Sequence, residues 1–293
     1  MKILILSILL TLVTLSADAG SDRQFPNPGQ IYKPGVDVNF GQYLAKSLRG
    51  TRKVVLTFDD GPDAIRTPRL LDILKAYDVK ATFFVLTGNI NAETLPVVKR
   101  MIAEGHNVAS HHHNHISSDV KTEEVYRSEL KTSILKTAGL LEEENSLHRE
   151  IYYRFPYGAY GSKKLAYHHL NVMKEVSNDL FGDNCINFAF WDIDTADWLE
   201  TITPAEIAQG AMSNIFGGTA YNFEFKNGKY IKIKYNITKP IGGGVVLMHD
   251  VYDRTVNAVS LLLKQYKEKG VEVVSLQDVK EYSYGGKECR LKF

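Results

Sequence analysis

Alternation of strand-like and helix-like segments is the feature of this sequence that most restricts its fold. Short apolar runs rich in β-branched and aromatic residues predict strands at 53–58, 81–85, 107–109, 151–153, 187–190, 244–247 and 271–274. Amphipathic patterns between them predict helices at 67–77, 93–104, 122–142, 162–180, 203–215 and 255–269. Strand, helix, strand repeated in this way implies parallel strands with right-handed crossovers. About seven units fit a closed α/β barrel better than an open sheet, with the chemistry at the carboxyl ends of the strands.

The segments before this alternation have a different character. Lys2, the apolar stretch 3–15 and an A-x-A motif ending at Ala19 predict a signal peptide over residues 1–19, cleaved near Ala19. Residues 20–50 are rich in Pro, Gly, Asn and Gln, and we expect an irregular arm packed on the domain formed by residues 51–293. No later stretch is long and apolar enough for a membrane span. We therefore expect a protein that is secreted or periplasmic and acts as a monomer.

Charge and cysteine content narrow the classes of function. The 293 residues carry a formal net charge of +1, which argues against nucleic acid or an anionic membrane surface as the partner. The two cysteines, Cys185 and Cys289, are too few for a thiolate metal site. In an oxidising compartment they either pair and fix the C-terminal tail or remain separate, and the sequence leaves both possibilities open.

One segment interrupts the alternation of strands and helices. Residues 221–235 alternate apolar and polar side chains around Asn227-Gly228, which predicts a tight β-hairpin inserted over about 219–238. We interpret it as a surface hairpin, with a wall of the substrate site as the alternative.

Polar side chains follow the expected strands at the points where they end. Asp59 and Asp60 close the first run, and since side chains alternate along a strand, the two can do the same job only if the strand ends between them. One carboxylate can therefore hold a metal while the other moves a proton. His111 and His115 follow the third run, and one turn of helix would place both imidazoles on the same side. Two imidazoles and one aspartate are typical ligands of zinc or a related divalent ion.

Three later strand ends add further reactive groups. Arg154 precedes a Pro-Tyr-Gly turn at 156–158, whose backbone N–H groups can face an oxyanion. Asp197 and Trp198 follow the fifth run, and His249 ends the sixth. Each residue alone is compatible with packing or a structural ion pair. Five successive strand ends that present Asp-Asp, His/His, Arg, Asp-Trp and His together indicate an active site.

With these motifs the chain resembles the polysaccharide deacetylases of the NodB-homology type (carbohydrate esterase family 4). The resemblance covers roughly residues 50–280, and the motifs occur in family order at 57–62, His111 with His115, 154–157, 194–198, and Leu247 with His249. It implies a distorted (β/α)7 barrel, here with a β-hairpin insertion. It also implies hydrolysis of N-acetyl groups on a β-1,4-linked N-acetylglucosamine polymer, either peptidoglycan or a chitin-like chain.

The resemblance assigns roles to the motif residues. A divalent metal, most simply Zn²⁺, with Co²⁺ or another divalent ion as alternatives, is held by Asp60, His111 and His115. Asp59 then takes a proton from water as general base, and Arg154 holds it ionised. His249 donates a proton to the leaving amine, and Asp197 raises its pKa.

Other residues of the motifs shape the pocket. The backbone N–H of Tyr157 is implied to bind the oxyanion, and Trp198 and Leu247 are implied to line the space for the acetyl methyl group. His112 and His113 are expected to point away from the metal. His112 departs from the family pattern, which usually has Ser or Thr directly after the first histidine, and its bulk affects the metal loop.

Two other functions use the same motifs. An O-deacetylase acting on xylan needs the same site and is not separated by these residues. The alternative from another class is a catalytically silent carbohydrate-binding protein on the same fold. The presence of both the base Asp59 and the acid His249 argues against this alternative, whereas the unusual His112 is compatible with it. A zinc protease is disfavoured because the sequence has no H-E-x-x-H motif.

Overall fold

The computed structural model describes residues 45–147, 149–160, 168–282 and 289–292. The expected signal peptide, 1–19, and the expected arm as far as residue 44 lie outside the described residues. Within the described ranges no helix combines the length and the apolar character needed to cross a membrane.

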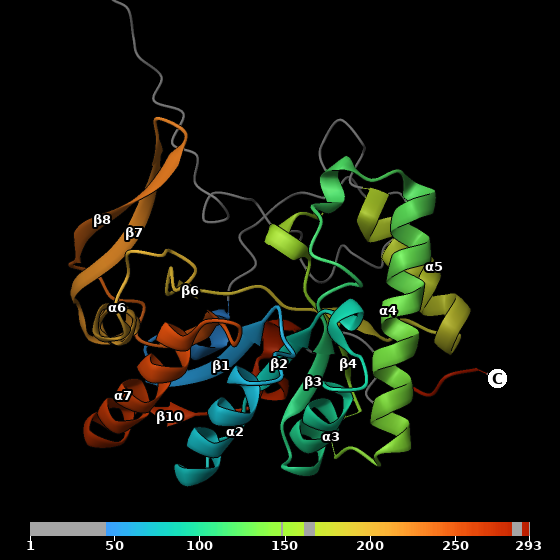
Figure 1. Cartoon of the computed structure of the whole chain (residues 1–293), viewed down its shortest axis with the longest axis horizontal. Helices are drawn as coiled ribbons and strands as arrows, with labels where there is room; N and C mark the ends of the chain where they lie inside the picture. The colour runs from blue at the N-terminus through green and yellow to red at the C-terminus, as the bar shows by residue number, and fades with distance from the viewer. Residues whose placement is uncertain (1–44, 148, 161–167, 283–288, 293) are drawn as a thin grey trace, which may run out of the picture.

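A parallel sheet forms the centre of the molecule (Figure 1). Seven strands lie in the order β5–β4–β3–β2–β1–β9–β6, and β10 pairs with β1 beside this path. The strands are β1 Lys53–Asp59, β2 Thr82–Val85, β3 Asn107–Ser110, β4 Ile151–Tyr153, β5 Ile186–Phe188, β6 Ile193–Asp194, β9 Gly244–His249 and β10 Glu272–Val273. This parallel arrangement confirms the distorted (β/α)7 barrel. Within the described residues no ladder joins β5 to β6, so the seam of the barrel lies between them.

The strand next to β9 differs from the sequence-based expectation. The run at 271–274 was expected as one of the seven strands, but β10 pairs only with the start of β1, through Lys53 and Val54. The place beside β9 is taken by the two-residue strand β6. Two residues are too few to show an apolar–polar alternation, so this strand left no signal in the sequence.

Helices cover the outside of the sheet (Figure 1). They are α2 Arg66–Ala76, α3 Leu95–Ala103, α4 Glu123–Glu143, α5 His168–Phe181, α6 Pro204–Phe216 and α7 Asp253–Lys269. Side-chain caps stabilise the N-termini of two of these helices. The Thr122 side chain accepts a hydrogen bond from the N–H of Val125 at the start of α4, and Thr203 and Glu206 form a capping box at the start of α6. The apolar sides of the helices pack on strands whose residues are almost all buried, which gives one main hydrophobic core.

The strand register brings the chemistry-bearing residues to one end of the sheet. Asp59 at the end of β1 is the register partner of His249 at the end of β9. At the neighbouring ends, Ser110 of β3 is paired with Tyr153 of β4, so that His111 and Arg154 follow directly. Because carboxyl ends of parallel strands meet at one edge, residues far apart in sequence converge there.

A disulfide joins Cys185 and Cys289, with their Cα atoms 5.9 Å apart. It settles the alternative that the sequence left open and fixes the C-terminal tail beside β5. The tail is also held by the N–H of Lys292, which donates to the carbonyl of Leu180 at 2.8 Å.

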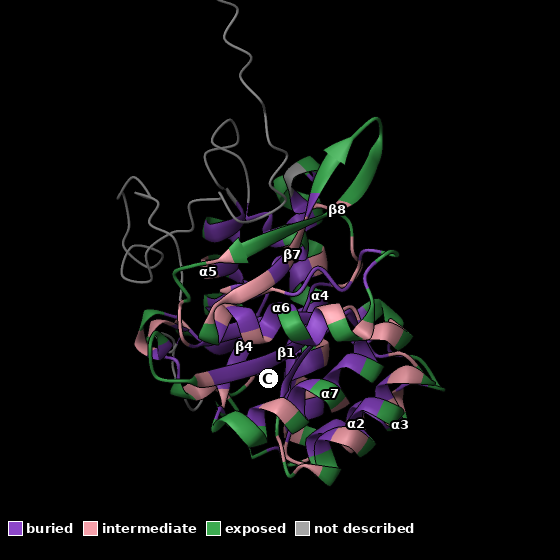
Figure 2. Cartoon of the chain, turned by 90° about the vertical axis from the view of Figure 1, so that its left-hand side faces the viewer, coloured by how far each residue is buried: buried purple, intermediate pink, exposed green. Residues whose placement is uncertain are grey.

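The inserted hairpin consists of β7 Gly218–Lys226 and β8 Lys229–Ile237. Asn227 and Gly228 form its turn, both with positive φ (51° and 75°), as the Asn-Gly pair predicts. Figure 2 shows that the two strands project from the barrel and that most of their outer part is exposed.

Candidate active site

A pocket of about 320 Å³ opens at the carboxyl ends of the strands. Its walls come from five of the motifs and from the hairpin, through Asp59, Asp60, His111, His115, Phe155, Tyr157, Trp191, Asp194, Trp198, Tyr230, Leu247, His249 and Tyr252. A pocket of this kind matches the usual design of a small-molecule or sugar site.

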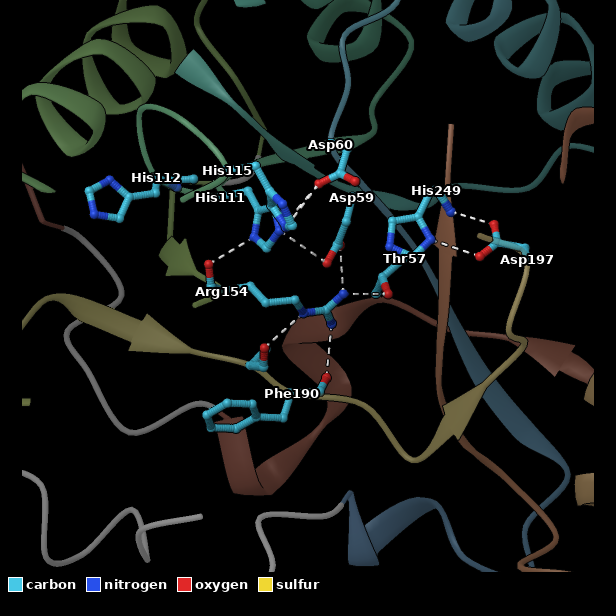
Figure 3. A network of polar contacts seen from close by, with 12 residues as sticks. Thr57, Asp59, Asp60, His111, His112, His115, Arg154, Phe190, Asp197 and His249 are labelled. Atoms are coloured by element: carbon cyan, nitrogen blue, oxygen red, sulfur yellow. Dashed lines mark hydrogen bonds and ion pairs between the residues drawn. The ribbon is translucent and has the colours of Figure 1, made fainter. Parts of the chain in front are cut away.

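Asp60, His111 and His115 form a compact set of candidate metal ligands (Figure 3). Their ligand atoms lie within 4.8 Å of one another, and both imidazole Nε2 atoms are 3.5 Å from Asp60 Oδ1. That oxygen is buried and has no hydrogen-bond partner among the described residues. Burial lowers the pKa of His111 well below its ordinary value, so its imidazole is neutral. An orphaned carboxylate oxygen that faces two imidazoles fits a divalent cation.

The other ring nitrogen of His111 is fixed by the backbone. Nδ1 lies 2.9 Å from the carbonyl oxygen of Arg154, which only accepts hydrogen bonds, so Nδ1 carries the proton. Nε2 therefore presents its lone pair toward Asp60. This is the usual outer-shell arrangement that orients a metal-binding histidine.

The backbone at Asp60 explains how two successive aspartates reach the same pocket. β1 ends at Asp59, and Asp60 has φ +74°, in the left-handed region that aspartate tolerates better than most residues. The strand alternation is broken at that point, and both side chains line the pocket. The sequence-based requirement that the strand end between the two carboxylates is met.

The loop that carries the histidines is not helical, contrary to the expectation of one helical turn. Residues 111–117 are irregular, and His112 has φ +76°. This turn still brings the rings of His111 and His115 to a centroid distance of 5.2 Å. A single residue with positive φ can bring the side chains at positions i and i+4 together, as one turn of helix does. The spacing of the two histidines therefore does not distinguish these two backbone conformations.

His112 points away from the candidate metal ligands, as expected (Figure 3). Its ring is buried against Tyr126 and Tyr153, and its Nδ1 accepts the N–H of His113 at 2.8 Å. Burial lowers the pKa of His112 to about 3, so the imidazole is neutral and its Nδ1 lone pair is free to accept. It thus braces the loop through a backbone hydrogen bond.

Arg154 holds Asp59 from the barrel interior (Figure 3). Its fully buried guanidinium donates to Asp59 Oδ1 at 2.7 Å and to Thr57 Oγ1 at 2.8 Å. It also donates to the carbonyls of Ala189 and Phe190, at the seam between β5 and β6. Burial raises the pKa of Asp59 to about 6, and Arg154 opposes that rise. The expected effect of Arg154 is present but smaller than that of burial, and the carboxylate remains mostly ionised at pH 7.

His249 and Asp197 form a second pair across the pocket from His111 and His115 (Figure 3). His249 Nδ1 lies 2.7 Å from Asp197 Oδ1, and the His249 N–H donates to Asp197 Oδ2 at 2.7 Å. Thr255 Oγ1 also donates to Oδ2, at 2.6 Å. Burial alone would lower the pKa of His249, but the Asp197 carboxylate outweighs it and raises the pKa to about 10.

The apolar side of the pocket includes residues that the motifs did not reveal. Leu247 and Trp198 line it as expected, and Tyr157 lies in a 3₁₀ turn with φ +57°, its ring tilted against that of His115 at a centroid distance of 4.2 Å. Trp191 and Tyr252 also line it, although neither was singled out in the sequence. A single aromatic residue next to a strand end is a weak signal, because most such rings belong to the core.

The hairpin contributes to the pocket, which corrects its interpretation as a surface feature only. Tyr230 of β8 lines the cavity and packs edge-on against Trp198, with ring centroids 5.0 Å apart. The sequence shows the hairpin but not its direction, which depends on the packing of Phe223 against Trp198.

A buried carboxylate beside the turn that follows Asp60 was also missed. Asp250 is fully buried and accepts a hydrogen bond from Thr67 Oγ1. A Cβ at Gly61 would lie 2.3 Å from Asp250 Oδ2, so only glycine fits the turn after Asp60. Burial raises the pKa of Asp250 to about 7.

The proposed ligand set leads to a direct prediction about metal content. His111→Ala is expected to remove most of the bound divalent metal, because it deletes one of three protein ligands and leaves Asp60 Oδ1 with a single imidazole neighbour. Elemental analysis of purified protein measures this. His113→Ala is the matched control, since it removes a neighbouring imidazole outside the set and should keep the metal. Equal metal content in the His111 variant and the parent would contradict the assignment.

Known proteins with similar sequences and folds belong to one group. Residues 46–175 match the family model described as polysaccharide deacetylase. The chain is 29% identical over 229 residues to the peptidoglycan-N-acetylglucosamine deacetylase PgdA of Listeria monocytogenes, covering 78% of this chain and 39% of that protein. It is 31% identical over 222 residues to a peptidoglycan-N-acetylglucosamine deacetylase of Bacillus cereus, covering 75% and 68%. The chain therefore spans about two fifths of the Listeria relative.

A solved structure agrees with this similarity. The polysaccharide deacetylase Bc1974 from Bacillus cereus superimposes with a TM-score of 0.54 at 30% identity, covering 77% of this chain and 93% of that one.

Proposed function

The chain belongs to the polysaccharide deacetylase family, and we propose that it hydrolyses the N-acetyl groups of β-1,4-linked N-acetylglucosamine polymers. The observation that carries this proposal is a single pocket that contains two ion pairs, Asp59 with Arg154 and His249 with Asp197. The candidate metal ligands lie beside them. An amide resists hydrolysis because its carbonyl is a poor electrophile and its amine a poor leaving group, and this set of residues addresses both.

The metal site supports a hydrolytic rather than a binding role. A divalent cation, most simply Zn²⁺, held by Asp60, His111 and His115, supplies Lewis acidity that polarises a carbonyl oxygen and makes water a stronger acid. Asp59 accepts the proton that water loses as its oxygen bonds to the acetyl carbon. Its pKa of about 6 suits a base at neutral pH.

Departure of the amine requires a proton, and His249 is placed to give it. Nδ1 donates to Asp197, so the proton transferred to the substrate nitrogen comes from Nε2 when the ring is charged. The carbon–nitrogen bond then breaks, releasing acetate and a free amine. We assign the backbone N–H of Tyr157 to the oxyanion, and Trp198 and Leu247 to the acetyl methyl group.

Peptidoglycan is the polymer that the relatives favour. Two of them are named peptidoglycan-N-acetylglucosamine deacetylases. Export after cleavage near Ala19 belongs to the same proposal, and the Cys185–Cys289 disulfide supports it because disulfides persist mainly in oxidising compartments. We propose that the protein acts as a monomer.

Acetate release from defined polymers tests the function. The purified chain with added Zn²⁺ or Co²⁺ is offered peptidoglycan, chitin oligomers and acetylated xylan, and metal-dependent acetate release is expected from the N-acetylglucosamine polymers. Release from xylan alone would assign O-deacetylation instead. Polymer binding without acetate release from any of the three would assign a silent carbohydrate-binding protein.

A further inference from the structure

Positive charge is concentrated on the hairpin that borders the pocket. Residues 218–237 contain four lysines and a single glutamate, in a chain whose formal net charge is only +1. The remainder of the chain is therefore slightly acidic. Figure 2 shows that the outer part of the hairpin projects freely from the barrel, with exposed residues on both strands. The charge is thus local to one side of the active-site opening.

Two of these lysines are unpaired and face each other. Lys226 and Lys229 are register partners across the Asn227-Gly228 turn, both exposed, and within the described residues neither forms an ion pair. Like charges directly opposite each other destabilise a hairpin. Lys232, by contrast, binds Glu206 at 2.7 Å. The two ammonium groups are therefore available to bind an anion.

A second depression, of about 660 Å³, collects these groups next to the catalytic pocket. It is lined by Thr201, Lys226, Asn227, Lys229, Tyr230, Ile231 and Lys232. Tyr230 lines this depression and the catalytic pocket alike. The two hollows therefore meet at Tyr230, and a chain that enters the catalytic pocket can continue past this ring to the hairpin.

Tyr230 itself suits contact with a sugar ring. It is 49% exposed, and edge-on contacts with Trp198 and Phe223 fix its ring at centroid distances of 5.0 and 5.5 Å. A rigid aromatic face offers a large contact area at low cost in side-chain entropy. Because side chains alternate along a strand, Lys226 and Lys229 lie on the other face of the hairpin from Tyr230, so the depression combines an aromatic platform with ammonium groups around the strand edge.

We propose that the hairpin forms a substrate subsite for a carboxylate-bearing segment of the glycan, with Tyr230 under a sugar ring and Lys226 and Lys229 binding carboxylates. The inference rests on the proposed deacetylase function and refines its substrate class. It selects an acidic N-acetylglucosamine polymer, such as a peptidoglycan strand with free carboxylates, over neutral chitin. The slightly acidic remainder of the chain makes a general affinity for polyanions a poor fit.

Binding to a matched pair of glycans tests this subsite. The probe is a soluble, fully N-acetylated peptidoglycan fragment with free carboxylates, and its partner is the same fragment with those carboxylates methyl-esterified. Affinities are measured by calorimetric titration with the full chain carrying Asp59→Asn and loaded with Zn²⁺, so that turnover does not interfere. The acidic fragment is expected to bind more tightly, and its advantage should shrink at high salt.

Charge removal on the hairpin provides the decisive comparison. Lys226→Gln with Lys229→Gln should reduce the acidic-over-neutral preference about three- to tenfold, since each exposed ion pair contributes modestly. The matched control, Lys264→Gln with Lys267→Gln, removes two exposed charges from α7 and should keep the preference. Tyr230→Ala should weaken both fragments to a similar extent, because stacking on the ring does not depend on charge.

The outcomes separate this inference from the proposed function. An unchanged acidic preference in the hairpin variant, or an equal loss in the α7 control, would overturn the subsite even if the parent chain releases acetate. A lysine-dependent preference without acetate release would sustain the subsite and overturn the deacetylase function.

Discussion

Replacing Asp59 with asparagine is expected to lower the rate of acetate release by about 10²- to 10⁴-fold while the metal content stays nearly unchanged. The amide has the shape of the carboxylate and can still accept from Arg154, whose guanidinium donates to Asp59 Oδ1 at 2.7 Å. It is not basic enough to take the proton that water loses. Single-turnover acetate release and elemental analysis on the same preparation measure the two effects.

Asp192→Asn is the matched control for this substitution. Asp192 is a half-buried aspartate whose pKa is likewise raised to about 6 by desolvation, but it binds the N–H groups of Val245 and Ala45, near the start of β9. This variant should keep its activity if it folds, which circular dichroism checks. Loss of the metal in Asp59→Asn would mean that the two neighbouring aspartates have exchanged roles.

The strand ends could be predicted because their signals are local and repeated. Each run of β-branched and aromatic residues stops at a polar motif, and parallel strands bring such ends to one edge whatever the packing around them. Asp59 and His249 illustrate this, since they are 190 positions apart and yet are register partners. Their convergence followed from topology alone.

What the sequence did not reveal depends on contacts between distant elements. The position of Tyr230 in the pocket depends on how the hairpin packs on Trp198, and no periodicity in residues 218–237 encodes that direction. Asp250 is similar, because its carboxylate fills the space that Gly61 leaves open. The turn at His112 replaced an expected helical turn, since a spacing of four residues is compatible with either backbone.

The direction of the pKa shift of Asp59 also could not be predicted from the sequence. The motif indicates a charge partner in Arg154 and therefore a lowered pKa, but the depth of burial determines the sign. Here burial prevails and the pKa rises to about 6. A charge pair can be read from residue types, whereas desolvation requires the packed structure.

His249→Ala is expected to reduce acetate release about 10²- to 10⁴-fold while sparing affinity for the glycan, because the amine can no longer leave as a neutral group. Glycan titration with the same variant separates the two effects. A variant that binds glycan weakly but releases acetate at the parent rate would remove His249 from the role of acid.

The pH profile gives an independent check on the same residue. Activity requires charged His249, so on the alkaline side it should decline as pH rises past the pKa of that ring, which lies at about 10. On the acid side it should decline as Asp59, whose pKa is about 6, becomes protonated. The other titratable groups that face the ring are Asp59, Asp60, His111, His115, Asp194, Asp197 and Tyr252. Asp197 bonds to Nδ1 directly, so Asp197→Asn should move the alkaline limb down by about 1–3 pH units. Because the other carboxylates remain in that variant, an unmoved limb would show that Asp197 does not set the charge of His249, whereas the expected shift ties the proton donor to this one hydrogen bond.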